Sequence, residues 1–213
     1  MDIQKGIVGI LNPDGQIIGT GFLVTETTIL TCAHVIKKAE SEPGGRVQIR
    51  FATDKSETVA VVDLSSWSPV DEHDTALLHI EHIPNDAEHL SLGSSSGTSG
   101  HIFRTYGYAT IGSVQGLGAR GEIIDVVEGG NLLQITSQEI ERGFSGAPVI
   151  DEARGVVVGM ITWGKTSTST QRHRDTTFAV TTEAIQNTYQ ELDFSDICPF
   201  LGLETGSFLG KRF

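Results

Sequence analysis

A serine set between glycines is the residue in this sequence best suited to nucleophilic chemistry. Ser145 lies within residues 142–150, with Gly143 and Gly146 beside it and an apolar β-type run after it. Glycine allows backbone conformations that other residues resist, and it lets a substrate approach closely. Gly143 can therefore turn its N–H, next to that of Ser145, toward one point and form an oxyanion hole for acyl transfer. Taken alone, the stretch is equally typical of a glycine-rich turn between two strands.

A serine hydroxyl becomes a strong nucleophile when a base takes its proton and a third group orients that base. His34 is a candidate base, because it lies where a β-type run ends and one turn of helix begins. Asp74 is a candidate for the orienting group, at the point where a polar segment meets an apolar strand. Asp71 and Glu72 are the alternatives beside it. The chain order His, Asp, Ser is one of three known for this geometry.

Most of the chain consists of short β-type runs separated by glycine-bearing turns. Such runs, with no long helix among them, indicate an all-β sandwich or barrel. A helix is predicted over residues 183–192, with Thr181 or Thr182 as its cap. The Ser/Gly-rich segment 91–100 is interpreted as the crossover between two halves. Strands are predicted at residues 7–11, 16–24, 28–31, 46–52, 57–64, 75–80, 101–108, 121–127, 132–136, 147–150, 156–163 and 177–180.

Charge, apolar content and cysteine count argue against several classes of function. The 213 residues carry a net charge of −12, which argues against binding to nucleic acid because that needs a basic face. No apolar run approaches the roughly 20 residues that span a bilayer, so no membrane partner is expected. The first residues lack the layout of a secretion signal, and only Cys32 and Cys198 occur, which is too few for a disulfide framework. A cytoplasmic protein is therefore expected.

Four short motifs resemble those of the chymotrypsin/trypsin-like serine proteases, particularly their bacterial intracellular branch. They occur in the order of that family, and the likeness covers roughly residues 7–192. The motifs are Thr-Cys-Ala-His at 31–34, Asp-Thr-Ala-Leu-Leu at 74–78, Gly-Phe-Ser-Gly-Ala-Pro-Val at 143–149 and Gly-Met-Ile-Thr-Trp-Gly at 159–164.

The resemblance implies a double six-stranded β-barrel of the trypsin-like type with a C-terminal helix. It assigns residues 1–195 to a protease domain, with barrels at about 1–92 and 101–182 and the helix at about 183–192. His34 and Asp74 would come from the first barrel and Ser145 from the second. The implied activity is that of a serine endopeptidase acting on protein or peptide substrates through an acyl-enzyme, with the oxyanion held by Gly143 and Ser145. Neither a metal nor a cofactor is implied.

Specificity depends on a residue that lies six positions before the nucleophile in the family, which is Glu139 here. A carboxylate at the floor of the primary pocket would pair with a substrate Arg or Lys. Glu139 could also point to solvent or be neutralised by Arg142, so the sequence leaves this open. The walls that the resemblance implies are Ile140, Thr162, Trp163 and Gly164.

Two further features concern control. Phe144 stands where family members activated by cleavage have an aspartate, so that activation route is absent. The tail at 196–213 resembles the lead-in that joins an effector domain to a STAND-type signalling ATPase, which implies a role in bacterial antiviral defence. Two alternatives stay open beside an active protease. One is a protease-fold interaction module without catalysis, and the other is a latent effector whose oxyanion loop a partner must order.

Overall fold

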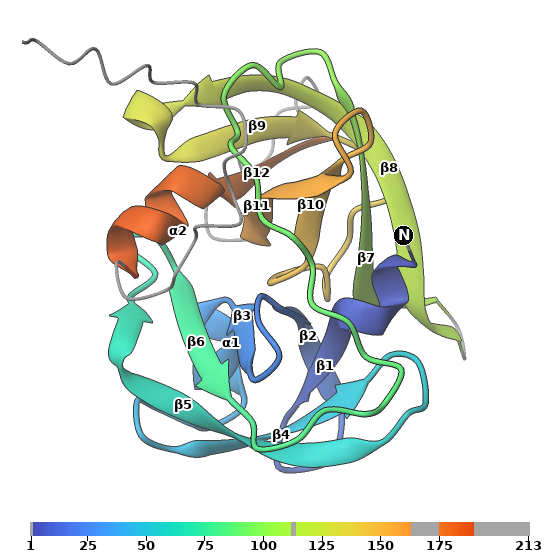
Figure 1. The fold of residues 1–213 in the computed structure, drawn as a ribbon, viewed down its shortest axis with the longest axis vertical. Coiled ribbons are helices and arrows are strands. Elements are labelled where there is room, and N and C mark those ends of the chain that lie inside the picture. Colours follow the sequence, from blue (N-terminus) through green and yellow to red (C-terminus); the bar gives the residue numbers. More distant parts are fainter. Residues whose placement is uncertain (1, 112–113, 163–174, 190–213) are drawn as a thin grey trace, which may run out of the picture.

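Residues 2–111, 114–162 and 175–189 are described by a computed structural model, and they form two closed six-stranded antiparallel β-barrels (Figure 1). The prediction of an all-β double barrel is confirmed. The first barrel has the order β1-β2-β3-β6-β5-β4, and the second has the order β10-β11-β12-β9-β8-β7. The strands are β1 (Ile7–Leu11), β2 (Ile17–Leu23), β3 (Thr28–Thr31), β4 (Arg46–Phe51), β5 (Glu57–Ser68), β6 (Thr75–His79), β7 (Ile102–Ile111), β8 (Val114–Val127), β9 (Leu132–Thr136), β10 (Pro148–Asp151), β11 (Val156–Thr162) and β12 (Thr176–Thr181).

Alternation of apolar and polar side chains closes each barrel around its own core. In β4, Val47, Ile49 and Phe51 are buried, whereas Arg46 and Gln48 between them are exposed. This follows because successive side chains of a strand point to opposite faces of the sheet. A strand with this pattern can have one face in a barrel core and the other in water.

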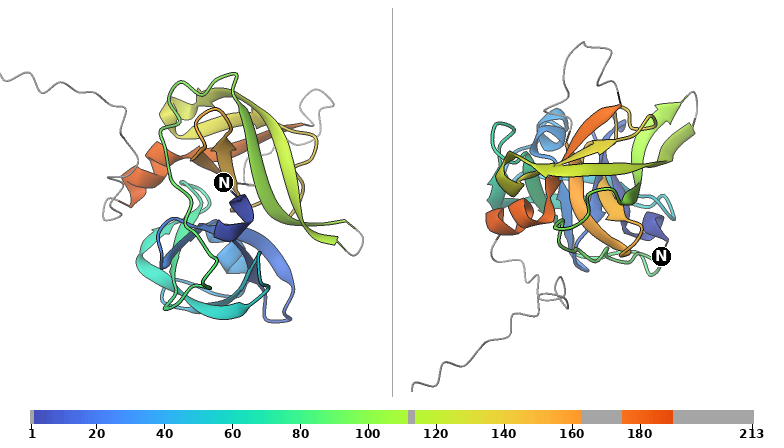
Figure 2. Two further views of the ribbon diagram at one scale, coloured as in Figure 1. Left: turned by 45° about the vertical axis from the view of Figure 1, so that its right-hand side comes forward. Right: turned by 90° about the horizontal axis from the view of Figure 1, so that it is seen from above.

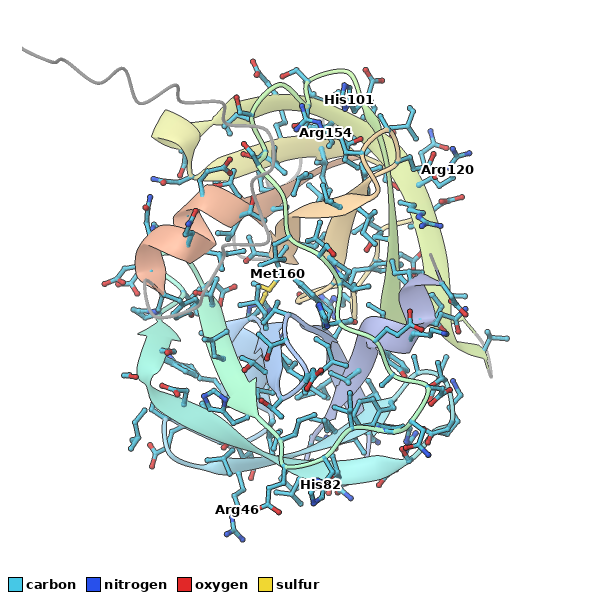
Figure 3. All side chains as sticks on the ribbon, in the orientation of Figure 1. Arg46, His82, His101, Arg120, Arg154 and Met160 are labelled. Atoms are coloured by element: carbon cyan, nitrogen blue, oxygen red, sulfur yellow. The ribbon has the colours of Figure 1, made fainter. Side chains whose placement is uncertain are left out.

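β1 departs from this alternation, since all five of its residues are buried. The reason is the second barrel, because β1 and β2 both contact β7 across the junction. Met160 of β11 belongs to the same apolar cluster as Ile7 and Cys32 of the first barrel, and it lies between the two barrels in Figure 3. The barrels therefore share apolar packing where they meet.

The segment between the barrels follows the outside of the molecule, where Figure 2 shows it in green. The N–H of Gly93 donates to the carbonyl of Val157, so the crossover is attached to β11 on its way. Two α-helices are described, α1 (Ala33–Lys38) and α2 (Thr182–Thr188), together with the 3-10 turns η1 (Ile3–Gly6) and η2 (Glu128–Gly130). Neither α-helix is long and apolar enough to cross a membrane.

Candidate active site

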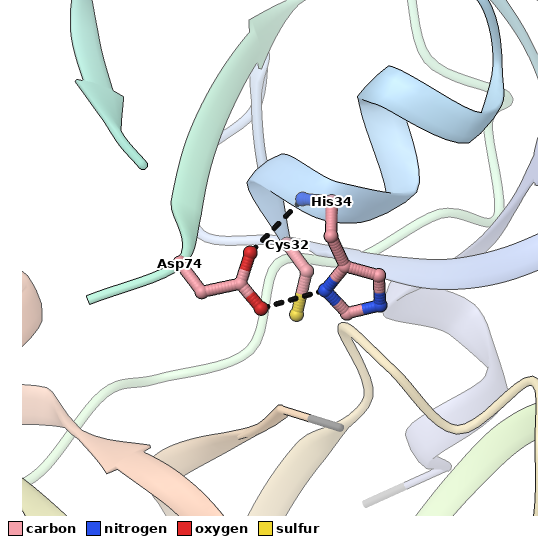
Figure 4. Close-up of side chains that lie close together, drawn as sticks. All are labelled: Cys32, His34 and Asp74. Atoms are coloured by element: carbon pink, nitrogen blue, oxygen red, sulfur yellow. Dashed lines mark hydrogen bonds and ion pairs between the residues drawn. The ribbon is translucent and has the colours of Figure 1, made fainter. Parts of the chain in front are cut away.

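His34 and Asp74 form a close pair at the junction of the barrels (Figure 4). The Nδ1 atom of His34 lies 2.6 Å from Oδ2 of Asp74, and the backbone N–H of His34 donates to Oδ1 at 2.9 Å. The two side chains are 14% and 4% exposed. Because an ionised carboxylate can only accept hydrogen bonds, Nδ1 of the neutral imidazole carries the proton and Nε2 is the basic nitrogen. Nε2 is buried and has no hydrogen-bond partner among the described residues.

Hydrogen bonds fix both the backbone and the side chain of Asp74. Its φ is +53°, a left-handed conformation that is uncommon for a residue other than glycine but is tolerated by aspartate. Its carbonyl accepts from the N–H of Ala33, and its N–H donates to Pro69. The hydroxyl of Thr162 donates to Oδ2 at 2.6 Å. Burial alone would raise the pKa of Asp74, but the hydrogen bonds from His34 and Thr162 outweigh it and lower that pKa.

Cys32 lies beneath this pair with its thiol fully buried (Figure 4). Its Sγ donates to the carbonyl of Ile161 at 3.3 Å. Burial raises the pKa of the thiol well above its usual value, and the charge of Asp74 adds to this. Ligand atoms of Cys32, His34 and Asp74 lie within 4.8 Å of one another. The carboxylate of Asp74 already accepts hydrogen bonds from His34 and Thr162 within the protein.

The serine loop needs glycine at two positions for steric reasons. Gly143 has a φ of +106°, and a Cβ there would lie 2.4 Å from the carbonyl oxygen of Tyr108. Gly146 has a φ of +87°, and its Cβ would lie 1.9 Å from the carbonyl oxygen of Thr20. The loop therefore packs on β7 of its own barrel at Gly143 and on the first barrel at Gly146, in both cases more closely than any other residue type would permit. Ser145 sits between these contacts with only 5% of its surface exposed.

The two N–H groups predicted to form the oxyanion hole differ from their neighbours in hydrogen bonding. The N–H of Phe144 donates to Glu141, and that of Gly146 donates to Ile161. Within the described part of the chain, neither Gly143 nor Ser145 donates its N–H to another backbone group. These two N–H groups thus have no backbone acceptor in the described part of the chain, and an oxyanion hole needs such free donors.

A cavity of about 670 Å³ adjoins Ser145 and Gly143. This volume falls within the usual range for ligand pockets. Apolar walls alternate with charged groups around it. Its other lining residues are Ile17, Ile18, Lys38, Tyr108, Glu141 and Arg142.

The predicted substrate-binding residues are not gathered in this cavity. Glu139 is exposed, does not line the cavity, and accepts a hydrogen bond from the N–H of Arg120 at 2.8 Å. Ile140 packs against the core of the second barrel. Thr162 is buried and bonds to Asp74 rather than facing a pocket. Trp163 and Gly164 lie outside the described residues, as does the tail at 196–213.

Two threonines make contacts in this site that the sequence does not predict: Thr162 bonds to Asp74, and Thr20 bonds to the carbonyls of Gly143 and Ser145. From the sequence, Thr162 is interpreted only as a pocket wall, and Thr20 only as part of a predicted strand, between Gly19 and Gly21. Those glycines were the one available signal, because they allow close packing of another segment on this strand.

Comparison with known proteins identifies a matching family. A family model described as the trypsin-like peptidase domain matches residues 19–160. A search of curated protein sequences found no match.

Three solved structures resemble the fold. The inactive form of the Rv3671c protease is 20% identical with a TM-score of 0.64, and each chain covers 90% of the other. A serine-to-alanine mutant of Rv3671c from M. tuberculosis H37Rv is 21% identical with a TM-score of 0.65, over 89% of this chain and 88% of that one. A serine endoprotease from Yersinia pestis is 18% identical with a TM-score of 0.65, over 89% of this chain and 63% of that one.

At such identities the structural similarity shows only that the fold is shared. The family model also shows membership of a family, because it spans about two thirds of the chain and includes both His34 and Asp74 together with the Ser145 loop. The chain therefore belongs to the family of trypsin-like peptidase domains.

Proposed function

We propose that this chain is a serine endopeptidase with His34, Asp74 and Ser145 as its catalytic triad. The observation that carries the proposal is the free Nε2 of a histidine whose Nδ1 is held by an ionised carboxylate. Ser145 attacks the peptide carbonyl while His34 takes its proton at Nε2, and Asp74 stabilises the imidazolium that forms. The N–H groups of Gly143 and Ser145 receive the developing oxyanion. Water then hydrolyses the acyl-enzyme.

A fluorophosphonate probe tests this proposal directly, because it reacts with an activated serine. We expect the purified protein to be labelled at Ser145, and we expect Ser145→Ala and His34→Ala to abolish labelling. A well-folded wild-type protein that stays unlabelled would favour the interaction module or the latent effector instead. Adding cell extract to that sample then separates the two, because only a latent effector would gain labelling.

For specificity, we propose cleavage after Arg or Lys, with Glu139 as the recognising carboxylate. Its support is the position of Glu139, six residues before Ser145, where the family resemblance puts the recognising residue, together with the exposure of this side chain. A peptide library should then show Arg or Lys at the cleaved position. Glu139→Gln should lower kcat/KM for those peptides by about tenfold or more, while Glu122→Gln should leave it unchanged. A profile dominated by small or acidic residues would exclude this specificity.

The biological setting that we propose is a cytoplasmic defence effector that is linked to a STAND-type ATPase module. Its support is the resemblance of residues 196–213 to such a lead-in. Mass spectrometry of the native polypeptide tests it, because the proposal requires a product much longer than 213 residues. In that longer protein, serine labelling should depend on the nucleotide supplied. A native product that ends near Phe213 would overturn the proposed link.

A further inference from the structure

Thr20 connects the first barrel to the nucleophile loop of the second. It lies in β2 and is fully buried. Its N–H donates to the carbonyl of Ser145 at 2.9 Å. Its hydroxyl donates to the carbonyl of Gly143 at 2.7 Å. One residue thus holds two carbonyls of the loop that are separated by Phe144.

These two hydrogen bonds fix the peptide groups on either side of the Ser145 N–H. The Gly143 carbonyl belongs to the peptide before Phe144, and the Ser145 carbonyl belongs to the peptide after Ser145. The peptide that carries the Ser145 N–H lies between them, so its direction is set by its two fixed neighbours. The Gly143 N–H is constrained from the other side, because Gly143 packs directly on the backbone of Tyr108.

The Thr20 hydroxyl has its own orientation fixed by a second contact. It accepts a hydrogen bond from the N–H of Tyr108 at 2.9 Å, which leaves its proton for the carbonyl of Gly143. The carbonyl of Thr20 in turn accepts from the hydroxyl of Thr31 at 2.7 Å. Thr31 ends the strand that leads into His34. Hydrogen bonds through Thr20 therefore connect the loop of Ser145 to the strand that ends just before His34.

We propose that Thr20 is a positioning residue that holds the oxyanion hole in its working geometry from the opposite barrel. This inference rests on the proposed protease function. It assigns to the Thr20 hydroxyl a role that a residue of the same shape without a hydroxyl cannot fill. Without it, the partly buried carbonyl of Gly143 and the buried N–H of Tyr108 both lose their partner, and the peptides of the loop can rotate toward other donors.

The test is Thr20→Val, which keeps the backbone N–H and the β-branched shape but removes the hydroxyl. We expect kcat, and the rate of fluorophosphonate labelling per folded molecule, to fall about 10- to 100-fold. KM should change little, because the hole acts on the transition state more than on the bound substrate. Thr20→Ser should restore most of the rate. Labelling of Thr20→Val at the wild-type rate would overturn the proposal.

Thr105→Val is the matched control. Thr105 is a buried threonine of β7 whose hydroxyl has no hydrogen-bond partner among the described residues, so removing that hydroxyl should leave the rate unchanged. If Thr20→Val lowers only the melting temperature and the folded fraction reacts normally, Thr20 is structural and the proposal fails.

A second measurement keeps the inference separate from the proposed function. Amide NMR signals of Gly143 and Ser145 should shift in Thr20→Val and stay in place in Thr105→Val, whether or not the protein is an active enzyme. An unlabelled wild type with shifted amide signals would refute the protease proposal but retain the positioning role. Unchanged amide signals would refute the positioning role itself.

Discussion

Asp74 combines a strained backbone with a fully engaged carboxylate. Its positive φ places a cost on the fold, and the contacts with Ala33, His34 and Thr162 hold it in that conformation. Such strain is found at functional sites, where surrounding contacts over-determine the geometry. The function of this residue is therefore predicted to depend on its charge and its acceptor pattern more than on its size.

Asp74→Asn tests that dependence. The amide can donate to Nδ1 of His34, which would move the proton to Nε2 and remove the basic nitrogen from the side of Ser145. We expect kcat to fall by about four orders of magnitude with little change in stability. Asp71→Asn is the matched control, since Asp71 is an exposed neighbour that was considered as an alternative orienting residue. Steady-state kinetics on a peptide substrate checks both, and equal losses in the two variants would contradict the assignment.

Gly146→Ala tests the close approach of the serine loop to the first barrel. Gly146 and Gly15 both have positive φ, but a Cβ at Gly15 would meet nothing within 4 Å. Gly15→Ala therefore measures backbone strain alone and should cost about 1 kcal/mol of unfolding free energy. Gly146→Ala adds a collision with Thr20 and should cost about 3 kcal/mol or more. Urea unfolding measures both, and equal losses would mean that the loop can move away.

The residue types of the site could be predicted from sequence, whereas their contacts could not. Short motifs identified His34, Asp74 and Ser145, because His34 follows a recognisable β-type run and the other two precede one. The contact of Thr20 with Gly143 joins residues 123 positions apart, and no local pattern encodes it. For Glu139, a motif position alone did not reveal that the side chain bonds to Arg120 instead of lining the cavity.

Most strands were predicted with nearly the right bounds, and the differences have local causes. β9 has the predicted bounds, and β1 does as well. β8 begins at Val114 instead of residue 121, because Gly116 and Gly118 interrupt the apolar pattern that signals a strand. In the structure, pairing with β7 extends β8 through these glycines. Tertiary pairing thus decides where this strand begins.

Hydrogen bonds join the N-terminus of α2 to the crossover segment. Thr181 caps the helix by accepting from the N–H of Ala184, as one of the two predicted caps. Glu183 in the first turn accepts hydrogen bonds from the hydroxyl of Ser94 and from both the N–H and the hydroxyl of Ser95. The Ser/Gly-rich segment therefore owes part of its path to one carboxylate on a helix that follows it by almost ninety residues.

Glu183→Gln tests this connection through its pH dependence. Burial alone would raise the pKa of Glu183, but hydrogen bonds from Ser94 and Ser95 outweigh it and lower that pKa. A carboxyl with a lowered pKa in the folded state stabilises the fold above its unfolded pKa of about 4.3, and this contribution is lost as the pH falls through the folded value. We expect the variant to be about 1–2 kcal/mol less stable at pH 7, with the gap closing below about pH 4.

Urea titrations at several pH values measure that gap. Glu26→Gln, at an exposed position in the turn between β2 and β3, is the control and should match the wild type throughout. A difference between Glu183→Gln and the wild type that stays constant down to pH 3 would mean that the carboxylate charge is not what holds the crossover.

The two barrels and α2 share contacts that make them one unit. Residues of both barrels belong to one apolar cluster, including Ile7 of β1 and Met160 of β11. At the end of α2, the Tyr189 hydroxyl lies 2.5 Å from the hydroxyl of Thr75, the residue that follows Asp74. Asp74 thus stands beside a contact that comes from the residue following the last described helix, α2. Separating the barrels would expose this cluster and unpair buried polar groups at once.

Because the two barrels share an apolar cluster, we expect them to unfold together. In Trp163→Phe, Trp67 of β5 is the only tryptophan left and reports on the first barrel, while far-ultraviolet circular dichroism follows both barrels. We expect the two signals to change at the same urea concentration, because both barrels contribute residues to one apolar cluster where they meet. Tyr189→Phe should shift both curves together by about 1 kcal/mol. If fluorescence and circular dichroism instead change in separate steps, each barrel folds by itself and the catalytic groups meet only by docking of two preformed halves.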